Sequence, residues 1–369
     1  MQHMYKKILC IRADNMGDLV MSSPALRALK ETFLCHITVL TSSMAKPITG
    51  FIPVIDEVIV RDLPWIKAGA TTTGTELVEL AALLRSYNFD AAFIFTVYSQ
   101  SALPAAMLTM MAGIPARWAY SRENPYELLT HWIPDKEPYQ YIKHQVQRDV
   151  DLVMAAGARV NDDRLLVTVD EAAHESMINK LQQAGMDITN GYIVFHAGVS
   201  EEKRQYPIPL WVELGKQAAA LNIPIILSGS AREAGLTGTI AAGIDSSHVF
   251  DLAGQLSIGE LIALINGARA LVSVNTATIH IAAARQTPVI VLYALTNPQH
   301  TPWKVKGAVF PFNVARELQS KNEIIHYVRT HCMKVVPDYP SPATVARALT
   351  RLLQQQTAVR NITMDALLQ

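Results

Sequence analysis

Short segments that are apolar throughout, with no polar alternation, recur along the whole chain and constrain its fold more than any other feature. The segments that we expect to form strands are residues 7–13, 36–42, 57–61, 90–96, 117–120, 192–197, 223–228, 248–252, 270–275 and 288–294. Amphipathic segments that predict helices lie between them, at residues 18–33, 76–87, 101–112, 209–221, 232–242, 257–267 and 276–285. Strands that are apolar on both faces belong in parallel sheets covered by helices on both sides. The chain is therefore predicted to be α/β, with doubly wound parallel sheets.

The length and a polar interruption predict two domains. The chain has 369 residues, and the pattern of strands and helices is broken between residues 157 and 190, where Asn161-Asp162-Asp163 is an example. We expect a Rossmann-like domain over residues 1–170, a second one over residues 171–354, and a frayed tail over residues 355–369. Ligands of open parallel sheets bind at the carboxyl ends of the strands. Two such domains facing each other would form one cleft, and the loops that follow the strands are where we expect chemistry.

Charge and cysteine content exclude several classes of protein. The chain carries 32 Lys and Arg residues against 32 Asp and Glu residues, which argues against a nucleic-acid-binding protein. Its 3 cysteines show no paired or metal-like spacing, and the first residues do not form a signal peptide, so we expect a cytoplasmic protein. Residues 91–116 are uncharged, but Ser99–Ser101 and Pro104 interrupt them, which predicts a strand and a helix and not a membrane span.

The first predicted strand ends in a turn that brings a carboxylate to the start of a helix. The segment runs Arg12-Ala13-Asp14-Asn15-Met16-Gly17-Asp18. A dinucleotide-binding fingerprint would need three spaced glycines here, so an NAD-type site is not expected. The spacing leaves two interpretations of Asp18 open: a cap of the helix N-terminus, or a general base. Pro24 lies inside the same predicted helix and should kink or restart it.

Two later loops have the residues of an anion-binding site. After residues 192–197, Gly198 and Ser200 precede Lys203, so close backbone N–H groups are followed by a mobile cation. Another strand ends at Asn275, and a helix begins at Thr276 and Ala277, with His280 one turn later. An ordinary surface loop and an ordinary capped helix explain these residues as well. No cluster of His, Cys, Asp and Glu has metal spacing, so we expect chemistry without a metal.

Glu233 follows another predicted strand and has two interpretations. It lies just after Ser228-Gly229-Ser230. An acidic residue in this place often accepts hydrogen bonds from the hydroxyls of a ribose. It is equally explained as a first-turn glutamate that the helix dipole favours.

Taken together and in this order, these segments resemble glycosyltransferase family 9, the ADP-heptose:lipopolysaccharide heptosyltransferases. The resemblance spans residues 7–303 and is carried by Lys7–Arg12, Met16–Asp18, Ser23–Leu29, His196–Gly198, Lys203–Arg204, Tyr206–Pro207, Leu252–Gly254, Asn275, His280, Ala282–Ala284 and Thr296–Pro298. It implies a GT-B fold of two facing Rossmann-like domains, with the acceptor bound by the N-terminal domain and the nucleotide-sugar by the C-terminal one.

The resemblance also implies a mechanism and roles for single residues. Transfer would be inverting and independent of metal, with Asp18 as the general base. Lys203 and the helix that starts at Thr276 would stabilise the leaving diphosphate. The residues implied for nucleotide and phosphate binding are Gly198, Ser200, Lys203, Thr276, Ala277 and His280. Glu233 would bind the ribose or the base, and Asn275 would contact the donor sugar.

The chain departs from the family's pattern at two places. It has Asn275-Thr276-Ala277 where Asp-Ser-Gly or Asp-Thr-Gly is usual, and Tyr206 where Trp is usual. Asparagine lacks the negative charge of aspartate, and alanine disfavours a positive φ. The first departure falls where the diphosphate and donor sugar should lie, so the donor's identity, and activity itself, stay open on the sequence.

We therefore expect a glycosyltransferase that moves heptose or a related sugar, without a cofactor, from a nucleotide-sugar such as ADP-heptose. The acceptor would be a lipid-linked glycan, the lipopolysaccharide core or another surface glycan, reached by peripheral contact with the cytoplasmic face of the inner membrane. Lys136, Lys143 and Arg148, or Arg117 and Arg122, would offer a cationic surface to a phosphorylated acceptor. The alternatives are a non-catalytic nucleotide-sugar-binding protein of GT-B fold, and another GT-B enzyme such as a nucleotide-sugar 2-epimerase.

Overall fold

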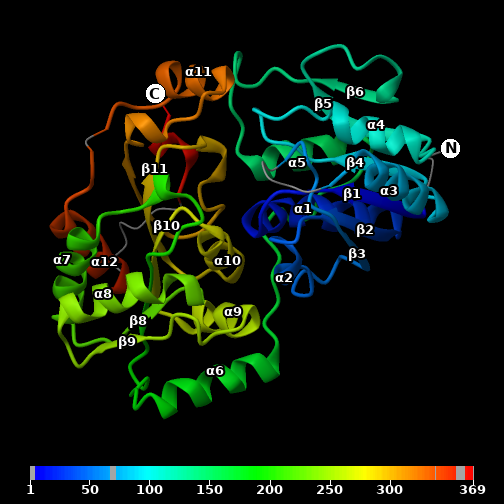
Figure 1. The fold of residues 1–369 in the computed structure, drawn as a ribbon. Coiled ribbons are helices and arrows are strands. Elements are labelled where there is room, and N and C mark those ends of the chain that lie inside the picture. Colours follow the sequence, from blue (N-terminus) through cyan, green and yellow to red (C-terminus); the bar gives the residue numbers. More distant parts are fainter. Residues whose placement is uncertain (1–4, 67–71, 337, 355–361, 369) are drawn as a thin grey trace. The chain divides into compact units, whose positions relative to one another are not determined.

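The chain consists of two compact units, each built around one parallel sheet. The computed structural model describes residues 5–66, 72–336, 338–354 and 362–368. The units are Met1–Leu166 and Val167–Gln369, and each holds a six-stranded sheet flanked by helices (Figure 1). This confirms the predicted α/β class.

The sheet of the N-terminal unit has the strand order β3-β2-β1-β4-β5-β6. Its strands are β1 (Lys7–Ile11), β2 (His36–Thr41), β3 (Glu57–Val60), β4 (Ala91–Ile94), β5 (Ala116–Ser121) and β6 (His131–Pro134). Its α-helices are α1 (Met16–Phe33), α2 (Lys46–Thr49), α3 (Gly74–Ser86), α4 (Leu103–Met111) and α5 (Gln145–Ala155). The direction of strand progression reverses between β1 and β4. The loop after β1, which leads to Asp18, therefore starts at the switch point where ligands of such sheets bind.

The sheet of the C-terminal unit repeats this arrangement, in the order β12-β11-β10-β7-β8-β9. Its strands are β7 (Ile193–His196), β8 (Ile225–Ser228), β9 (Val249–Asp251), β10 (Ala270–Val274), β11 (Val289–Ala294) and β12 (Gly307–Phe312). Its α-helices are α6 (Glu171–Gln183), α7 (Ile208–Ala219), α8 (Ala234–Ile244), α9 (Ile258–Gly267), α10 (Ala277–Arg285), α11 (Glu323–His331) and α12 (Pro342–Leu353). Here the switch lies between β7 and β10, whose following loops carry Gly198 and Asn275.

All the strands and helices expected from the sequence are present, with boundaries shifted by a few residues. The sequence missed β6 and β12, which end in Pro134 and contain Pro311. Both are edge strands, where a proline is tolerated because one side of the strand has no neighbour to accept a hydrogen bond from. It also missed helices such as α5, whose buried face combines Val146, Val150 and Val153 with the charged Arg148 and Asp149.

Helix α1 continues through Pro24, so the predicted restart there is wrong. A proline cannot donate the backbone hydrogen bond that the carbonyl of Val20, four residues earlier, would normally accept. The hydroxyl of Ser23 donates to that carbonyl instead, at 2.6 Å. The side chain next to the proline thus satisfies the acceptor that the proline leaves, which lets the helix continue.

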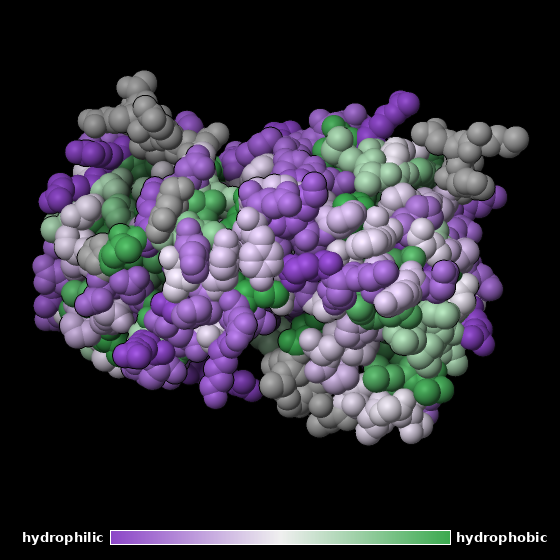
Figure 2. Space-filling model, turned by 90° about the horizontal axis from the view of Figure 1, so that it is seen from above, coloured by the Kyte–Doolittle hydropathy of each residue, from purple (hydrophilic) through white to green (hydrophobic). Residues whose placement is uncertain are grey.

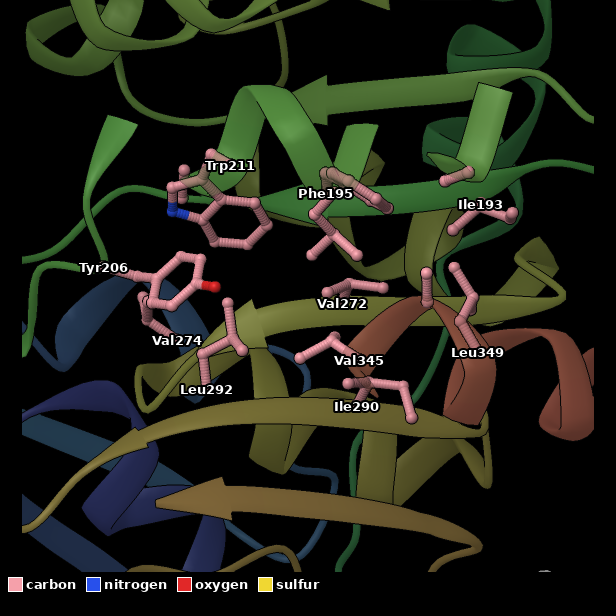
Figure 3. Close-up of a cluster of buried hydrophobic side chains, with 14 of the residues drawn as sticks. Ile193, Phe195, Tyr206, Trp211, Val272, Val274, Ile290, Leu292, Val345 and Leu349 are labelled. Carbon is pink, nitrogen blue, oxygen red and sulfur yellow. The ribbon is translucent and has the colours of Figure 1, made fainter. Parts of the chain in front are cut away.

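The core of the C-terminal unit includes the tyrosine that departs from the family's pattern. Tyr206 is fully buried and packs edge-on against Trp211, with ring centroids 5.7 Å apart (Figure 3). Its hydroxyl donates to the carbonyl of Pro340 at 2.7 Å. The smaller ring thus fills a core position and satisfies its polar atom, so this departure is a packing feature of the core.

The end of the chain is only partly as expected. Residues 355–361 and 369 lie outside the described residues, but 362–368 do not fray. Leu367 is fully buried, the backbone N–H of Ile362 donates to the carbonyl of Val305 at 3.0 Å, and Leu368 forms a β-bridge with Met333. The expectation of a frayed tail is wrong for this segment, because its apolar side chains Ile362 and Leu367 are buried.

No helix within the described ranges is long and apolar enough to cross a membrane. The uncharged stretch that raised the question forms β4 and α4, as predicted. On the face shown in Figure 2, hydrophilic side chains predominate and hydrophobic ones gather in small groups.

Candidate functional site

Asp18 lies in the first turn of α1 and caps it. Asn15 precedes the helix in an extended conformation, and its backbone N–H donates to Oδ2 of Asp18 at 3.2 Å. Oδ1 of Asp18 accepts a hydrogen bond from Nη2 of Arg12 at 3.0 Å. The cap interpretation is therefore confirmed. It is compatible with the base interpretation, since a neighbouring guanidinium favours the ionised form of a carboxylate, and a base must be ionised.

Arg12 contacts the carboxylates of both Asp14 and Asp18, and the sequence did not single it out. It is 1% exposed, and its Nε lies 3.4 Å from Oδ2 of Asp14. Burial by itself would lower the pKa of the guanidinium, but Asp14, Asp18 and Asp149 raise it above the ordinary value. Burial raises the pKa of Asp14, although Arg12 and a 2.6 Å hydrogen bond from Gln100 oppose this. Two carboxylates thus share one buried guanidinium, and we call Arg12, Asp14 and Asp18 the Arg12 cluster.

A second buried carboxylate network joins α1 to α5. Asp149 accepts hydrogen bonds from the hydroxyl of Ser22 at 2.6 Å and from Nε2 of Gln145 at 2.7 Å. Burial raises the pKa of Asp149 to about 6, although Arg12 and these hydrogen bonds favour its ionised form. The side chain of Asp149, on α5, is therefore hydrogen-bonded to α1, the helix that carries Asp18.

The cationic surface expected on the N-terminal unit is not formed. Arg148 is buried, and its guanidinium donates to both carboxylate oxygens of Asp135 at 2.9 Å and to Glu137 at 2.7 Å. Arg117 and Arg122 donate to backbone carbonyls, and Lys143 pairs with Asp151. These four cations bind the protein itself, so the interpretation of them as an acceptor-binding surface is wrong.

In the C-terminal unit, Gly198 and Glu233 lie against each other. A Cβ atom added at Gly198 would be 2.2 Å from the carboxylate of Glu233, so the side chain of Glu233 would have to move to admit it. Glu233 accepts a hydrogen bond from the backbone N–H of Ser230 at 2.6 Å, which is the geometry of a capping box. The cap interpretation of Glu233 is thereby confirmed, and its carboxylate lies at the loop that follows β7. His196, at the end of β7, has its pKa lowered by burial.

Lys203 and Arg204, the two cations in the loop after β7, have different partners. Lys203 pairs with Glu201 at 2.8 Å. Arg204 also pairs with Glu201, and its Nη1 donates to the backbone carbonyl of Asn275 at 3.3 Å. The cation that joins the two candidate anion-binding loops is therefore Arg204, which the sequence placed beside Lys203 without a role of its own. Ser200 is exposed.

The side chain of Asn275 binds the end of β11. Its Nδ2 donates to the carbonyl of Ala294 at 3.2 Å and to Oγ1 of Thr296 at 3.2 Å. Its Oδ1 accepts the backbone N–H of Ala294 at 3.1 Å. An amide can both donate and accept in this way, whereas the carboxylate usual in the family cannot donate. The departure to asparagine thus has a structural reason within the chain.

Helix α10 begins directly after Asn275, as expected. Thr276 precedes the helix in an extended conformation, and its hydroxyl lies 2.8 Å from that of Thr278. Ala277 is the first helical residue and is not among the residues with positive φ, so the backbone here does not require glycine. His280 is buried, with its ring edge-on to that of His300 at 6.5 Å.

The structure therefore groups the predicted residues into two sets. Gly198, Glu233, Asn275, Thr276 and Ala277 lie at or just after the carboxyl ends of strands of the C-terminal sheet. Asp18 belongs to the N-terminal unit. Within the ranges that the structure describes, no three His, Cys, Asp or Glu side chains are grouped closely enough to hold a metal ion.

The two sheets define the fold of the chain. Two parallel sheets of the same strand order, each with its polar residues at the carboxyl ends of the strands, form the GT-B fold. Solved structures of this fold match the chain over nearly its whole length. The glycosyl transferase family 9 from Veillonella parvula has a TM-score of 0.75 at 17% identity, covering 96% of this chain and 99% of that chain. E. coli ADP-heptose lps heptosyltransferase II has a TM-score of 0.69 at 22% identity, covering 95% and 100%.

Sequence comparison then identifies the family. Residues 77–327 match the model of glycosyltransferase family 9 (heptosyltransferase), and the chain belongs to this family. Lipopolysaccharide heptosyltransferase 2 of Escherichia coli is 26% identical over 306 residues, which is 80% of this chain and 85% of the relative. Lipopolysaccharide heptosyltransferase 1 of Pseudomonas aeruginosa is 25% identical over 301 residues, 80% of each chain. The protein is thus a glycosyltransferase, as the resemblance implied.

Proposed function

We propose that the protein transfers heptose, or a closely related sugar, from ADP-heptose to a sugar of the lipopolysaccharide core or of another surface glycan. The observation that carries this proposal is the family match over residues 77–327. It is supported by two relatives that are lipopolysaccharide heptosyltransferases and whose sequences match 80% of this chain. The acceptor is assigned to the N-terminal unit and the nucleotide-sugar to the C-terminal unit.

In this proposal Asp18 is the general base. Arg12 donates a hydrogen bond to its carboxylate and holds it at the start of α1, at the switch point of the sheet. The ionised carboxylate takes the proton of an acceptor hydroxyl, whose oxygen then attacks the anomeric carbon of the donor sugar from the side opposite to the diphosphate. The bond to the diphosphate breaks through an oxocarbenium-like transition state, and the anomeric configuration is inverted.

The leaving diphosphate is assigned to the loops of the C-terminal unit. Negative charge that develops on it would be stabilised by Lys203 and by the N-terminus of α10 at Thr276 and Ala277. We add Arg204 to this set, because it already bridges the loop after β7 to Asn275. These groups would do the work that a divalent metal ion performs in other glycosyltransferases.

The remaining residues of the C-terminal unit are assigned to the nucleotide and the donor sugar. Gly198, Ser200 and His280 would line the phosphates, and Glu233 would accept hydrogen bonds from the ribose or the base. The amide of Asn275 is engaged by the backbone of Ala294. Its proposed contribution to the donor-sugar site is therefore to hold the loops after β10 and β11 in place.

We propose that the N-terminal unit also makes the peripheral contact with the cytoplasmic face of the inner membrane. The helices α3 and α4 expose apolar side chains, each of them more than a third accessible to solvent: Val78, Leu83, Met107, Met110 and Met111. Exposed apolar groups of this kind mark interaction surfaces. Replacing Met107 and Met110 by glutamine should reduce sedimentation with anionic phospholipid vesicles. The matched control is Met154→Gln, at an exposed methionine on α5, and equal loss in both variants would refute this surface.

The base assignment is tested by Asp18→Asn, with Asp14→Asn as the matched control on the same guanidinium. Donors would first be screened for binding among ADP-, GDP- and UDP-sugars, and transfer then measured on lipopolysaccharide-core acceptors. Asp18→Asn should keep donor affinity but lose transfer by about 10²- to 10⁴-fold, whereas Asp14→Asn should retain most of it. Unchanged transfer by Asp18→Asn would refute the base assignment. The configuration of the product and its yield in the presence of a chelator test inversion and metal independence.

A further inference from the structure

The C-terminal unit has a pocket that none of the assignments above uses. Its volume is about 740 Å³, and it lies where β11 and β12 end. Its wall is formed by Leu295, by residues 313–316 and 319 after β12, by Arg329 and Thr330 of α11, and by residues 333–335, 338 and 339. Because it opens at the carboxyl ends of parallel strands, it lies on the edge of the sheet where ligands bind.

Cations dominate the charged residues of this pocket. Arg316, Arg329 and Lys334 line it, against a single carboxylate, that of Asp338. Arg329 contacts Nδ1 of His326 at 2.9 Å, and Lys334 donates to the backbone carbonyl of Asp365 at 2.6 Å. None of the three forms an ion pair with a carboxylate in the described part of the chain. The pocket therefore has positive charge that the protein itself does not neutralise.

The wall of the pocket is fixed by packing. The ring of Tyr339 packs against Phe312 and Tyr206, with ring centroids 5.2 and 6.0 Å apart. Nδ2 of Asn313 donates to the carbonyl of Val336 at 2.7 Å, and the backbone N–H of Lys334 donates to the carbonyl of Leu367 at 3.0 Å. A site built on such contacts is preorganised, so little ordering entropy is lost when a ligand binds.

The pocket adjoins the loop assigned to the donor sugar. Leu295 lines the pocket, and the next residue, Thr296, accepts the hydrogen bond from Asn275. On the N-terminal unit, by contrast, four of the five cations that the sequence suggested for an anionic acceptor bind the protein itself. The pocket is thus a cationic site next to the donor-sugar loop that none of the assignments above uses.

We propose that this pocket binds an oxyanion carried by a sugar of the glycan acceptor, a phosphate monoester or a carboxylate. The inference rests on the proposed transfer function for its biological ligand. Two arginines suit this chemistry, since a planar guanidinium donates two parallel hydrogen bonds to the oxygens of one phosphate or carboxylate. The pocket selects acceptors whose reacting sugar lies close to such an anion.

The first experiment tests the pocket without any transfer. Inorganic phosphate is titrated into the full chain, and binding is followed by isothermal titration calorimetry, in the wild type and in the double variant Arg316→Gln, Arg329→Gln. The matched control is Arg347→Gln, Arg351→Gln, which removes two exposed cations from α12 of the same unit. The affinity for phosphate should be equal in the wild type and the control and at least about tenfold weaker in the double variant. Equal phosphate binding by all three proteins would overturn the proposal, whether or not transfer has been detected.

The second experiment tests the ligand. With a competent acceptor, the double variant should raise the KM for the acceptor about tenfold or more while kcat and donor affinity stay near wild type. Acceptors from which the phosphates are removed, or on which the carboxylates are esterified, show which oxyanion is bound, because the matching acceptor loses its dependence on the two arginines. An adventitious anion site would bind inorganic phosphate with no change in the acceptor KM, and that result would overturn the proposal. Absence of transfer in every protein, with phosphate bound as expected, would refute the proposed function and leave the anion site supported.

Discussion

Replacing Asn275 by aspartate, the residue usual in the family at this position, should destabilise the C-terminal unit at neutral pH. The substitution changes almost no volume, so its effect comes from hydrogen bonding and charge. Asn275 is 7% exposed and donates to Ala294 and to Thr296. A carboxylate would place a second acceptor against the carbonyl of Ala294, with no proton between the two oxygens.

The expected loss in the free energy of unfolding is about 2 kcal/mol at pH 7. Losing a neutral hydrogen bond costs about 1 kcal/mol, and a buried acceptor without a donor costs about 1–3 kcal/mol. The stronger, charge-assisted bond from the N–H of Ala294 to the other oxygen returns about 1 kcal/mol of this. Burial next to a carbonyl raises the pKa of the introduced carboxyl, so the folded state takes up a proton first on acidification. The loss is therefore present above the folded-state pKa and disappears below it, where the protonated carboxyl donates to Ala294 again.

The assay is urea denaturation of the wild type and the variant between pH 4 and pH 8, together with hydrogen exchange of the Ala294 amide. The control is Asn266→Asp, at an exposed asparagine that accepts a hydrogen bond from Arg285, where a change within about 0.5 kcal/mol is expected. An unfolding free energy of Asn275→Asp that matches the wild type at pH 7, or a loss that grows as the pH falls, would refute the reasoning.

Three further predictions concern stability and can be tested by urea denaturation. Arg148→Met removes a 1% exposed guanidinium and leaves its partner carboxylates buried and uncompensated, so unfolding should be easier by about 3–5 kcal/mol; a loss below about 1 kcal/mol would contradict this. The pKa of Asp149, about 6, lies above its value in the unfolded chain, so between pH 4 and 6 the folded state binds one more proton and wild-type stability falls as the pH rises. The free energy of unfolding of Asp149→Asn should therefore gain about 2 kcal/mol on that of the wild type between pH 4.5 and pH 7. A difference between the two proteins that does not change with pH would contradict a carboxyl group that is protonated when buried. Gly307→Ala would place a Cβ 1.9 Å from the carbonyl oxygen of Val289 and should cost about 3 kcal/mol, so a fully stable variant would show that β12 can shift away from β11.

The elements that the sequence predicted are those whose type is decided locally. A strand such as β4 is apolar at every residue, and the helices α3 and α9 begin with a Ser or Thr and a Glu three residues later, which form capping boxes. The edge strands β6 and β12 escaped prediction because their prolines contradict the strand pattern, and only a place at the edge of a sheet makes them tolerable.

Some features of the candidate site could likewise be predicted from residues close together in the chain, and others could not. The sequence predicted polar groups at the carboxyl ends of two strands, from the single-glycine turn before Asp18 and from the helix start at Asn275-Thr276. The structure has polar groups at both places. The sequence did not predict that Arg12 would be shared by two carboxylates, or that Arg204 would contact the Asn275 loop and Lys203 would pair with Glu201. Neighbouring cations are equivalent in sequence, and the direction of each side chain is decided by the loop's path.

The sequence by itself thus determined the fold class, the family and the strands whose ends carry the polar residues, because periodicity and turn chemistry depend on residues close together in the chain. The tertiary structure alone decided which charge faces which partner. Ser22 and Asp149, which share a 2.6 Å hydrogen bond, are 127 residues apart, and Tyr206 and Pro340 are 134 residues apart. Such pairs exist only after helices and strands have packed, since burial makes each buried charge and hydroxyl take the partner that packing brings within reach.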